Sequence, residues 1–301
     1  MNELKGLGTA LITPFKADGE VDYTALERLL DTQLSGYVDY IVVLGTTGEA
    51  ATMSEEEKMQ VRTFIRDYVN GRLPLVLGVG GNCTANVCEA LRTTDLSGFC
   101  AILSVCPYYN KPSQEGLYRH FCAVAEASPI PVILYNVPGR TGVNLQPETV
   151  MRIYEAHPGK IAGIKEASGN VEQIKDLIKL SAVSHQHSYP YSGTIISDFL
   201  VISGDDGIAC ELMEAGAAGL ISVASNAFAE DFHKIVHEKD REMQAKYAEI
   251  IRLLFAEGNP SGIKTVLSQK GIIENIVRLP LVSNSAEVQE AIRRQLAVLE
   301  A

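Results

Sequence analysis

Lys165 has the clearest potential for covalent chemistry in this sequence, because it ends the apolar run that begins at Ile161. A lysine at the end of a strand points into the mouth of a sheet or barrel, whereas most lysines lie on solvated helix faces. Withdrawal from water favours the neutral amine, which is the form that attacks a carbonyl carbon to give a Schiff base. A lysine in this position is still more often solvated than catalytic, so the hypothesis depends on its neighbours.

Two such neighbours stand in the segment Tyr135-Asn136-Val137-Pro138-Gly139-Arg140. Tyr135 ends another apolar run, and a phenol there can relay protons. Arg140 follows in a Pro-Gly loop, and a guanidinium can hold a carboxylate through two parallel hydrogen bonds. An ion pair with a surface acid is the alternative for Arg140. Beside Lys165, this phenol and guanidinium favour the catalytic interpretation.

Hydroxyl groups gather at the ends of two further apolar runs. Thr46 and Thr47 lie in Leu44-Gly45-Thr46-Thr47-Gly48-Glu49, where two glycines allow a tight turn and the hydroxyls can bind a carboxylate. The alternative is an ordinary strand-to-helix turn. Tyr108 and Tyr109 follow the apolar run Ala101–Val105. They could relay protons or serve only in packing.

Other patterns predict no cofactor, metal or nucleic-acid site. Gly78-Val79-Gly80-Gly81 departs from the dinucleotide pattern because residue 83 is cysteine. Ser203-Gly204-Asp205-Asp206-Gly207 lacks the later spaced acids of a calcium loop and reads as a turn. The six cysteines form no C-x-x-C pair or zinc-like spacing, so core positions are expected. A net charge of −11 argues against a nucleic-acid partner.

Continuous apolar runs, typical of parallel strands covered on both faces, alternate with helical patterns. Ser54 with Glu57 forms a capping-box signature, and Asp22 and Ser113 are further N-cap candidates. The expected helices are Tyr23–Ser35, Ser54–Tyr68 and Ser113–Ala127. The expected strands are Thr9–Thr13, Tyr40–Leu44, Leu75–Val79, Ala101–Val105, Pro131–Tyr135, Ile161–Lys165, Phe199–Ser203 and Gly219–Val223.

Eight such strand–helix units predict an α/β fold, a (β/α)8 TIM barrel over residues 1–229, with an open doubly wound sheet as the alternative. After Asn226 the strand pattern stops, so residues 230–301 are expected to form a C-terminal helical extension, broken at Gly258-Asn259-Pro260 and near Pro280. No run of ~18 apolar residues predicts a membrane span, and the N-terminus lacks a signal-peptide pattern. We therefore expect a cytoplasmic protein.

The motifs together closely resemble the dihydrodipicolinate synthases, also named 4-hydroxy-tetrahydrodipicolinate synthases, of the N-acetylneuraminate lyase superfamily of Schiff-base aldolases. The resemblance rests on Gly45-Thr46-Thr47-Gly48-Glu49, Tyr108-Tyr109-Asn110, the segment from Tyr135 to Gly142, and Gly163-Ile164-Lys165-Glu166. It extends over nearly the whole chain, including Asn259-Pro260 and Arg278-Leu279-Pro280. It implies condensation of pyruvate with L-aspartate 4-semialdehyde, on the route to diaminopimelate and lysine, without a metal or organic cofactor.

The resemblance also implies roles for the catalytic residues. Lys165 would form the Schiff base with pyruvate. Tyr135, Thr46 and Tyr109 would form the proton relay. Tyr109 would reach this relay across a subunit interface, so a homo-oligomer, a dimer or homotetramer, is implied.

The same resemblance implies roles in substrate binding. Arg140 would hold the carboxylate of the semialdehyde, and Thr47 would bind the carboxylate of pyruvate. Gly204 and Ile221 would line the site through their backbones. A sialic acid lyase or sugar-acid aldolase is the nearest alternative, but those relatives lack an arginine at the Arg140 position. A catalytically silent binding protein on the same fold is the other.

Two features depart from the family pattern. The segment 184–193, with its histidines, is longer than the usual connection and is expected on the barrel face away from chemistry, as a solvated or interface loop. The second departure concerns inhibition by lysine, which sensitive relatives bind at a subunit interface.

In this sequence Asn82 and Tyr108 of that inhibitory site remain, but its histidine positions read Glu55 and Lys58, and its glutamate position reads Asn86. The loss of an acid and the gain of a cation both oppose an ammonium ligand. We therefore expect weak inhibition by lysine or none.

Overall fold

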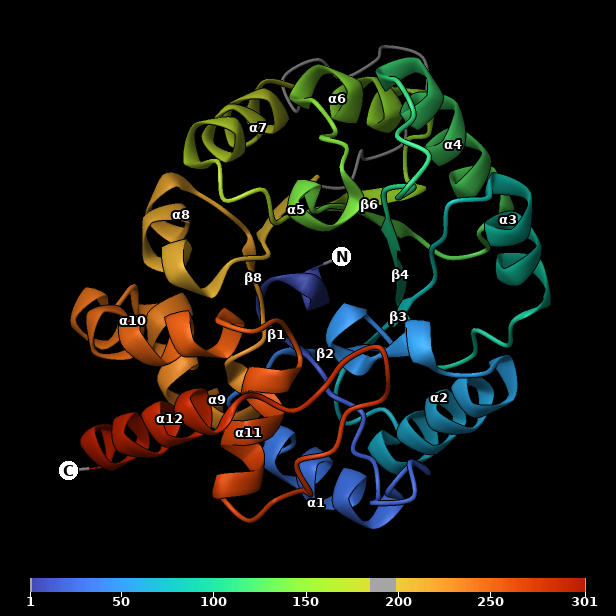
Figure 1. Ribbon diagram of the computed structural model, residues 1–301. Coiled ribbons are helices and arrows are strands. Elements are labelled where there is room, and N and C mark those ends of the chain that lie inside the picture. Colours follow the sequence, from blue (N-terminus) through green and yellow to red (C-terminus); the bar gives the residue numbers. More distant parts are fainter. Residues whose placement is uncertain (1, 185–198, 301) are drawn as a thin grey trace.

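Eight parallel strands close into a barrel in the computed structural model, which describes residues 2–184 and 199–300 (Figure 1). Each strand pairs with the next, and β8 pairs with β1 to complete the ring. The predicted (β/α)8 barrel is thus confirmed, and the open sheet is wrong. The strands are β1 Gly6–Ala10, β2 Tyr40–Val43, β3 Leu75–Gly78, β4 Ala101–Val105, β5 Val132–Asn136, β6 Ile161–Glu166, β7 Leu200–Ser203 and β8 Gly219–Ser222.

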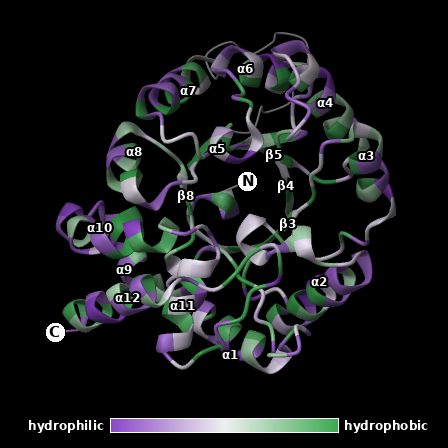
Figure 2. Cartoon of the chain, viewed as in Figure 1, coloured by the Kyte–Doolittle hydropathy of each residue, from purple (hydrophilic) through white to green (hydrophobic). Residues whose placement is uncertain are grey.

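The apolar runs are continuous because both faces of the barrel wall are buried. Along β2, Tyr40 and Val42 belong to the apolar interior of the barrel, whereas Ile41 and Val43 pack in the layer between strands and helices. Figure 2 shows the matching pattern on the surrounding helices, which carry hydrophilic residues on much of their outer surface. Burial on both faces leaves no alternation along the strands.

The first strand lies three residues earlier than expected, at Gly6–Ala10 instead of Thr9–Thr13. It begins at Gly6 because this residue pairs with Gly219 at the closure, where a side-chain β-carbon on Gly219 would come within 2.1 Å of the Gly6 carbonyl oxygen. It ends early because the Asn226 side chain accepts the hydrogen bond from the backbone N–H of Ile12, at 3.1 Å. The apolar run therefore continues past the strand.

Three of the helices that surround the barrel, α1, α2 and α4, begin at the predicted residue or one residue after it. Ser54 and Glu57 form the capping box of α2, and the side chains of Asp22 and Ser113 accept hydrogen bonds at the starts of α1 and α4. Such caps satisfy backbone N–H groups that the first turn leaves unpaired. These helices are α1 Tyr23–Gln33, α2 Glu55–Val69, α3 Thr84–Thr93, α4 Gln114–Ala127, α5 Pro138–Thr141, α6 Pro147–Ala156, α7 Val171–Ser184 and α8 Ala209–Ala215.

After β8 the described chain forms helices and no further strand, and these helices gather on one side of the barrel near α1 (Figure 1). The elements are α9 Ser225–His233, a π-helical turn Lys234–Glu238, α10 Arg241–Phe255, α11 Ser261–Gln269 and α12 Ala286–Leu299. The expected breaks at 258–260 and near Pro280 are confirmed, because they separate α10 from α11 and α11 from α12. The predicted boundary between residues 229 and 230 falls inside α9, and the division into catalytic barrel and extension stays a prediction.

Within residues 2–184 and 199–300, every helix is too short or too polar to cross a lipid bilayer. Of the long segment 184–193, residues 185–193 lie outside the described residues.

Candidate active site

Lys165 and Tyr135 lie side by side on neighbouring strands. They are register partners of β6 and β5, and the Lys165 amine lies 4.5 Å from the centre of the Tyr135 ring. Each residue is only 6% exposed. Among the described residues, no carboxylate forms an ion pair with Lys165. An amine that lies against a phenol and forms no ion pair with a carboxylate is suited to attack a carbonyl carbon.

Gly204 follows β7 and lies directly beside the aliphatic chain of Lys165. A β-carbon at this position would come within 2.8 Å of the Lys165 Cε and 2.7 Å of the Ala167 Cβ. Glycine is therefore required there for Lys165 to keep its path into the barrel mouth. Ile221 of β8 is buried in the same interior cluster as Tyr135.

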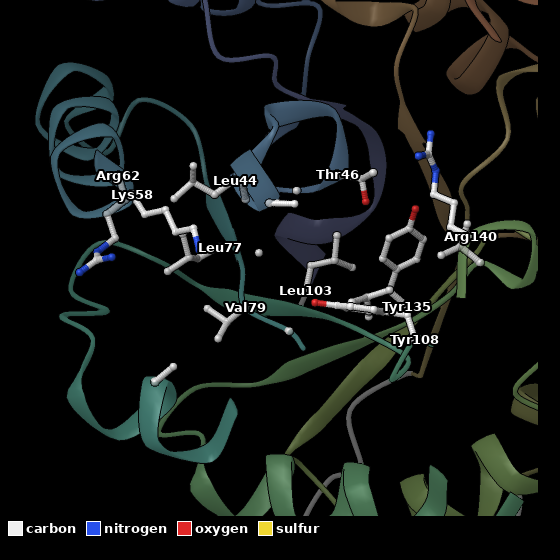
Figure 3. A pocket seen from close by; sticks show the side chains of 18 of the residues that line it. Leu44, Thr46, Lys58, Arg62, Leu77, Val79, Leu103, Tyr108, Tyr135 and Arg140 are labelled. Carbon is white, nitrogen blue, oxygen red and sulfur yellow. The ribbon is translucent and has the colours of Figure 1, made fainter. Parts of the chain in front are cut away.

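A cavity of about 370 Å³ opens at the barrel mouth and is lined by Thr46, Tyr135 and Arg140, together with Tyr108. Figure 3 shows the hydroxyl groups of Thr46 and Tyr135 pointing toward one another, with the Arg140 guanidinium nearby. Three of the predicted site residues are thus brought together from two strand ends, Thr46 from the turn after β2, and Tyr135 and Arg140 from the end of β5 and the α5 turn that follows it. A hydroxyl pair for proton transfer and a cation for a carboxylate occupy one end of this cavity.

The two threonines of the turn after β2 face different surroundings. Thr46, Thr47 and Gly48 form the 3-10 turn η2. Thr13 holds this turn by donating its hydroxyl hydrogen to the Gly48 carbonyl oxygen at 2.8 Å. Thr46 is exposed toward the cavity, whereas Thr47 is buried. The turn therefore places Thr46 in the lining of the cavity and directs the Thr47 side chain toward the helical tail.

The residue that Thr47 contacts there is Asn259, which precedes α11. Its carboxamide nitrogen donates a hydrogen bond to the Thr47 hydroxyl at 2.9 Å. Its backbone carbonyl accepts a hydrogen bond from Arg140 at 3.4 Å. Asn259 is buried and touches both predicted carboxylate-binding residues, Thr47 and Arg140. From the sequence, Asn259 was expected at a break in the helical tail and in a segment that carries the family resemblance, and no role in the site was predicted for it.

A buried network behind the strands holds β5 and β6 in register. The Glu166 carboxylate accepts hydrogen bonds from Asn136 at 2.9 Å, Gln173 at 3.1 Å and the backbone of Ser168 at 2.7 Å. Burial raises the pKa of Glu166, and these donors oppose the rise. Glu166 and Asn136 follow Lys165 and Tyr135 directly, so the network fixes the strand ends that carry the reactive pair.

Lys264 is a second buried lysine, but it is fully enclosed and forms an ion pair with Glu49. It is fully buried, 2.5 Å from the Glu49 carboxylate, and it donates to the Ile276 carbonyl at 2.8 Å. Burial lowers its pKa to about 8, and Glu49 counteracts part of that effect. The pair joins the turn after β2 to α11. Its enclosure makes Lys264 a structural lysine, in contrast to Lys165.

Tyr109 is not brought to the cavity within this chain. Its side chain is 89% exposed, and its backbone lies in the left-handed region with a φ of 75°. Residues other than glycine adopt this conformation at a cost in free energy, and such strain often accompanies functional positions. Tyr108, its neighbour, lines the cavity instead.

Two segments for which no cofactor or metal site was predicted, 78–81 and 203–207, have structural roles. A β-carbon at Gly78 would come within 2.3 Å of the Leu44 carbonyl oxygen, so this glycine permits close packing of β3 against the turn after β2. The Asp206 carboxylate accepts hydrogen bonds from the backbone of Val223 at 3.1 Å and Ala224 at 3.2 Å. Asp205 accepts one from Gly207 at 2.8 Å. Both acids thus stabilise turns.

Comparison with known proteins gives one consistent result. A relative from Parabacteroides distasonis, a 4-hydroxy-tetrahydrodipicolinate synthase, is 48% identical and aligns over 98% of each chain. The crystal structure of dihydrodipicolinate synthase from Thermotoga maritima matches with a TM-score of 0.90, 38% identity and 98% coverage of both chains. The chloride-inhibited dihydrodipicolinate synthase from Acinetobacter baumannii, complexed with pyruvate, matches with a TM-score of 0.89, 38% identity and the same coverage.

The model of the dihydrodipicolinate synthetase family matches residues 3–299, nearly the full length. This match covers the barrel, the strand ends that carry Lys165 and Tyr135, and the helical tail that supplies Asn259. The resemblance predicted from the motifs is confirmed, and the chain belongs to the dihydrodipicolinate synthetase family.

Proposed function

We propose that this chain catalyses the reaction for which its relatives are named, the condensation of pyruvate with L-aspartate 4-semialdehyde, through a Schiff base on Lys165. The observation that carries the proposal is the Lys165 amine, which is buried against the Tyr135 ring at 4.5 Å and forms no ion pair with an acid of residues 2–184 or 199–300. The cavity with Thr46 and Arg140 supports it. The pathway role would be the synthesis of diaminopimelate and lysine.

The chemistry assigns each proton transfer to a nearby hydroxyl. The Lys165 amine attacks the ketone carbon of pyruvate, and loss of water together with uptake of one proton from the relay leaves a protonated imine. The imine withdraws electrons, so a methyl proton leaves and an enamine forms. The enamine carbon attacks the aldehyde, whose oxygen takes up a proton. The amine of the substrate then displaces Lys165 by cyclisation. Tyr135 and Thr46 are placed to carry these protons.

Carboxylate binding falls to groups that can donate two hydrogen bonds or one well-directed bond. Arg140 would bind the carboxylate of the semialdehyde, because its guanidinium borders the cavity beside Tyr135. Thr47 would bind the carboxylate of pyruvate. Its oxygen accepts from Asn259, so its own hydrogen stays available for donation. Gly204 and Ile221 would border the bound substrate through their backbones.

The relay becomes complete only with a second subunit in this proposal. Tyr109 is exposed and strained in one chain, as expected of a side chain that enters the site of a partner. A homodimer or homotetramer would place it there. We assign the enzyme to the cytoplasm, with no nucleic-acid, membrane, metal or organic-cofactor partner.

Trapping with borohydride tests the covalent step. Pyruvate with sodium borohydride should add one reduced pyruvate unit to the intact mass, and peptide mapping should place it on Lys165. The Lys165→Ala variant should remain unlabelled. Labelling of another lysine in the unsubstituted protein would contradict the assignment.

A second assay separates the alternatives, because a sialic acid lyase or sugar-acid aldolase would also be trapped by pyruvate. The ring product should absorb when aspartate semialdehyde is the acceptor and should be absent with sugar aldehydes. Trapping without turnover of any aldehyde would indicate the binding-protein alternative.

A further inference from the structure

The turn that carries Thr46 is bounded by two residues in the left-handed region of backbone conformation. Leu44 precedes the turn with a φ of 56°, and Glu49 ends it with a φ of 54°. Residues with a side chain adopt this conformation at a cost in free energy, and it persists only where surrounding contacts impose it. The shape of this turn therefore depends on contacts from outside it.

The Thr46 side chain does not provide such a contact. Within residues 2–184 and 199–300, no hydrogen bond holds its hydroxyl, although Figure 3 shows this group pointing toward the Tyr135 hydroxyl. Its backbone carbonyl accepts a hydrogen bond from the N–H of Glu49 at 3.1 Å. The direction of the Thr46 hydroxyl thus depends on the position of the turn, and the turn is closed by Glu49.

The Glu49 carboxylate anchors this end of the turn to the helical tail. Its side chain is fully buried, and its Oε1 lies 2.5 Å from the Lys264 Nζ of α11. Its Oε2 accepts a hydrogen bond from the backbone N–H of Arg278 at 3.0 Å. Contacts at both oxygens, one of them with a charged group, fix the carboxylate in position and orientation.

The two partners of Glu49 are themselves held in place. The Lys264 Nζ and the guanidinium carbon of Arg278 each lie 4.2 Å from the centre of the buried Phe15 ring. Arg278 also forms an ion pair with Glu57 of α2 at 2.5 Å. Cations packed on an aromatic ring and bonded to acids resist displacement. A shift of the Glu49 carboxylate would therefore break several contacts at once.

We propose that Glu49 is a positioning residue for the reaction, whose buried carboxylate keeps Thr46 directed toward Tyr135 for proton transfer. The inference rests on the proposed function, because it assigns a task within the same proton relay. A buried ion pair is a weak source of stability, since the loss of hydration of both charges offsets their attraction. What the pair with Lys264 supplies is a defined position for the turn.

Removal of both charges together tests the positioning role. Lys264→Met/Glu49→Leu leaves no unpaired ion in the interior. Its kcat should fall about 10- to 100-fold, because displacement of a reacting group by about 1 Å has an effect of this size. KM for pyruvate should stay close to that of the unsubstituted protein, because Asn259 holds Thr47 separately. Borohydride labelling of Lys165 should also remain.

A cycle with Thr46→Val separates positioning from general loss of stability. Thr46→Val removes the hydroxyl that Glu49 is proposed to direct, so no relay group remains there to be misplaced. Addition of Lys264→Met/Glu49→Leu to Thr46→Val should leave kcat unchanged, because the two sets of changes act through one group. A further fall in kcat, as large as in the presence of Thr46, would overturn the proposal.

Two more variants complete the comparison. Lys264→Met/Glu49→Gln keeps an acceptor for the Arg278 N–H, so its kcat should fall less than that of the Glu49→Leu double variant. Tyr247→Phe is the matched control, because Tyr247 is also buried in the tail and its hydroxyl donates to the Asp231 carboxylate. It should lose stability and keep kcat. Unchanged kcat in both double variants would exclude the positioning role.

The unsubstituted protein distinguishes failure of this inference from failure of the proposed function. If it shows neither labelling of Lys165 nor turnover of the semialdehyde, the proposed function is wrong, and the inference falls with it. If it is labelled and turns over, and Lys264→Met/Glu49→Leu has the same kcat, only the role of Glu49 is wrong.

Discussion

The carboxamide of Asn259 donates a hydrogen bond to the hydroxyl of Thr47 at 2.9 Å, although 212 positions separate the two residues. The bond ties the helical tail to the turn after β2. It also orients Thr47, because a hydroxyl that accepts one hydrogen bond keeps its single hydrogen for another acceptor. In the proposed reaction that acceptor is the carboxylate of pyruvate.

Asn259→Ala should therefore raise KM for pyruvate about 10-fold, because the loss of one directed hydrogen bond costs about 1–1.5 kcal/mol. Asn284→Ala is the matched control. Asn284 is also buried in the tail and accepts a hydrogen bond from a threonine, Thr265, at 2.8 Å, whereas Asn259 bonds Thr47 and Arg140. Both variants should lose stability, and only the first should change KM. Equal KM values in the two variants would exclude the orienting role.

Substitutions of Tyr135 in the proton relay and of Arg140 in carboxylate binding should change different kinetic constants. Tyr135→Phe keeps the ring over Lys165 and removes the hydroxyl, so kcat should fall about 100-fold or more. Arg140→Ala should mainly raise KM for the semialdehyde and should leave pyruvate trapping intact. Steady-state kinetics and borohydride labelling of both variants provide the measurement. Equal loss of trapping in both would show that these roles are misassigned.

Lys264→Met should destabilise the protein without abolishing the labelling of Lys165. The substitution leaves the buried Glu49 carboxylate without its cation, and breaking a buried pair in this way costs about 3–5 kcal/mol. The double variant Lys264→Met/Glu49→Leu should recover much of this loss. Urea unfolding of the three proteins measures the difference. Similar free energies of unfolding for the single and double variants would argue against the pair.

His120 should make stability depend on pH. Burial lowers its pKa to about 4 from an ordinary value of 6.5, so the folded protein holds it neutral. Between these values the unfolded chain binds a proton that the folded chain does not, and the free energy of unfolding falls as pH drops through this window. His120→Gln should be less sensitive to pH from 6.5 to 4, by about 2–3 kcal/mol. Parallel pH profiles of the two proteins would refute the role of His120.

Lysine should inhibit weakly or not at all at millimolar concentration. Among the described residues that line the cavity, Glu55 is the one acid, and it is bound to Lys58 at 2.7 Å, so it is not free to receive an ammonium group. Lys58 and Arg62 add like charges there. A steady-state titration with lysine provides the measurement, and strong inhibition well below one millimolar would contradict the prediction. Glu55→Gln would then be the first variant to examine.

Local patterns in the sequence were enough to predict the barrel and much of its reactive end. Apolar runs bounded by turn residues predict β2 to β8 closely, because burial on both faces is a property of each strand. Capping residues predict the starts of helices for a similar reason, since each cap contacts its own first turn. Lys165 and Tyr135 could be selected because polar residues at the ends of such runs must meet at one mouth of a barrel.

Tertiary structure decided what depends on contacts between distant segments. No local pattern indicates that Asn259 bonds Thr47 or that Lys264 pairs with Glu49. The predicted β1 lies three residues late, because the closure at Gly6 and Gly219 and the bond to Asn226 arise only when the ring forms. Local patterns also do not distinguish two lysines that both become buried. Only the fold decides that Lys264 is enclosed with a carboxylate, whereas Lys165 lies against the ring of Tyr135, a residue that lines the cavity.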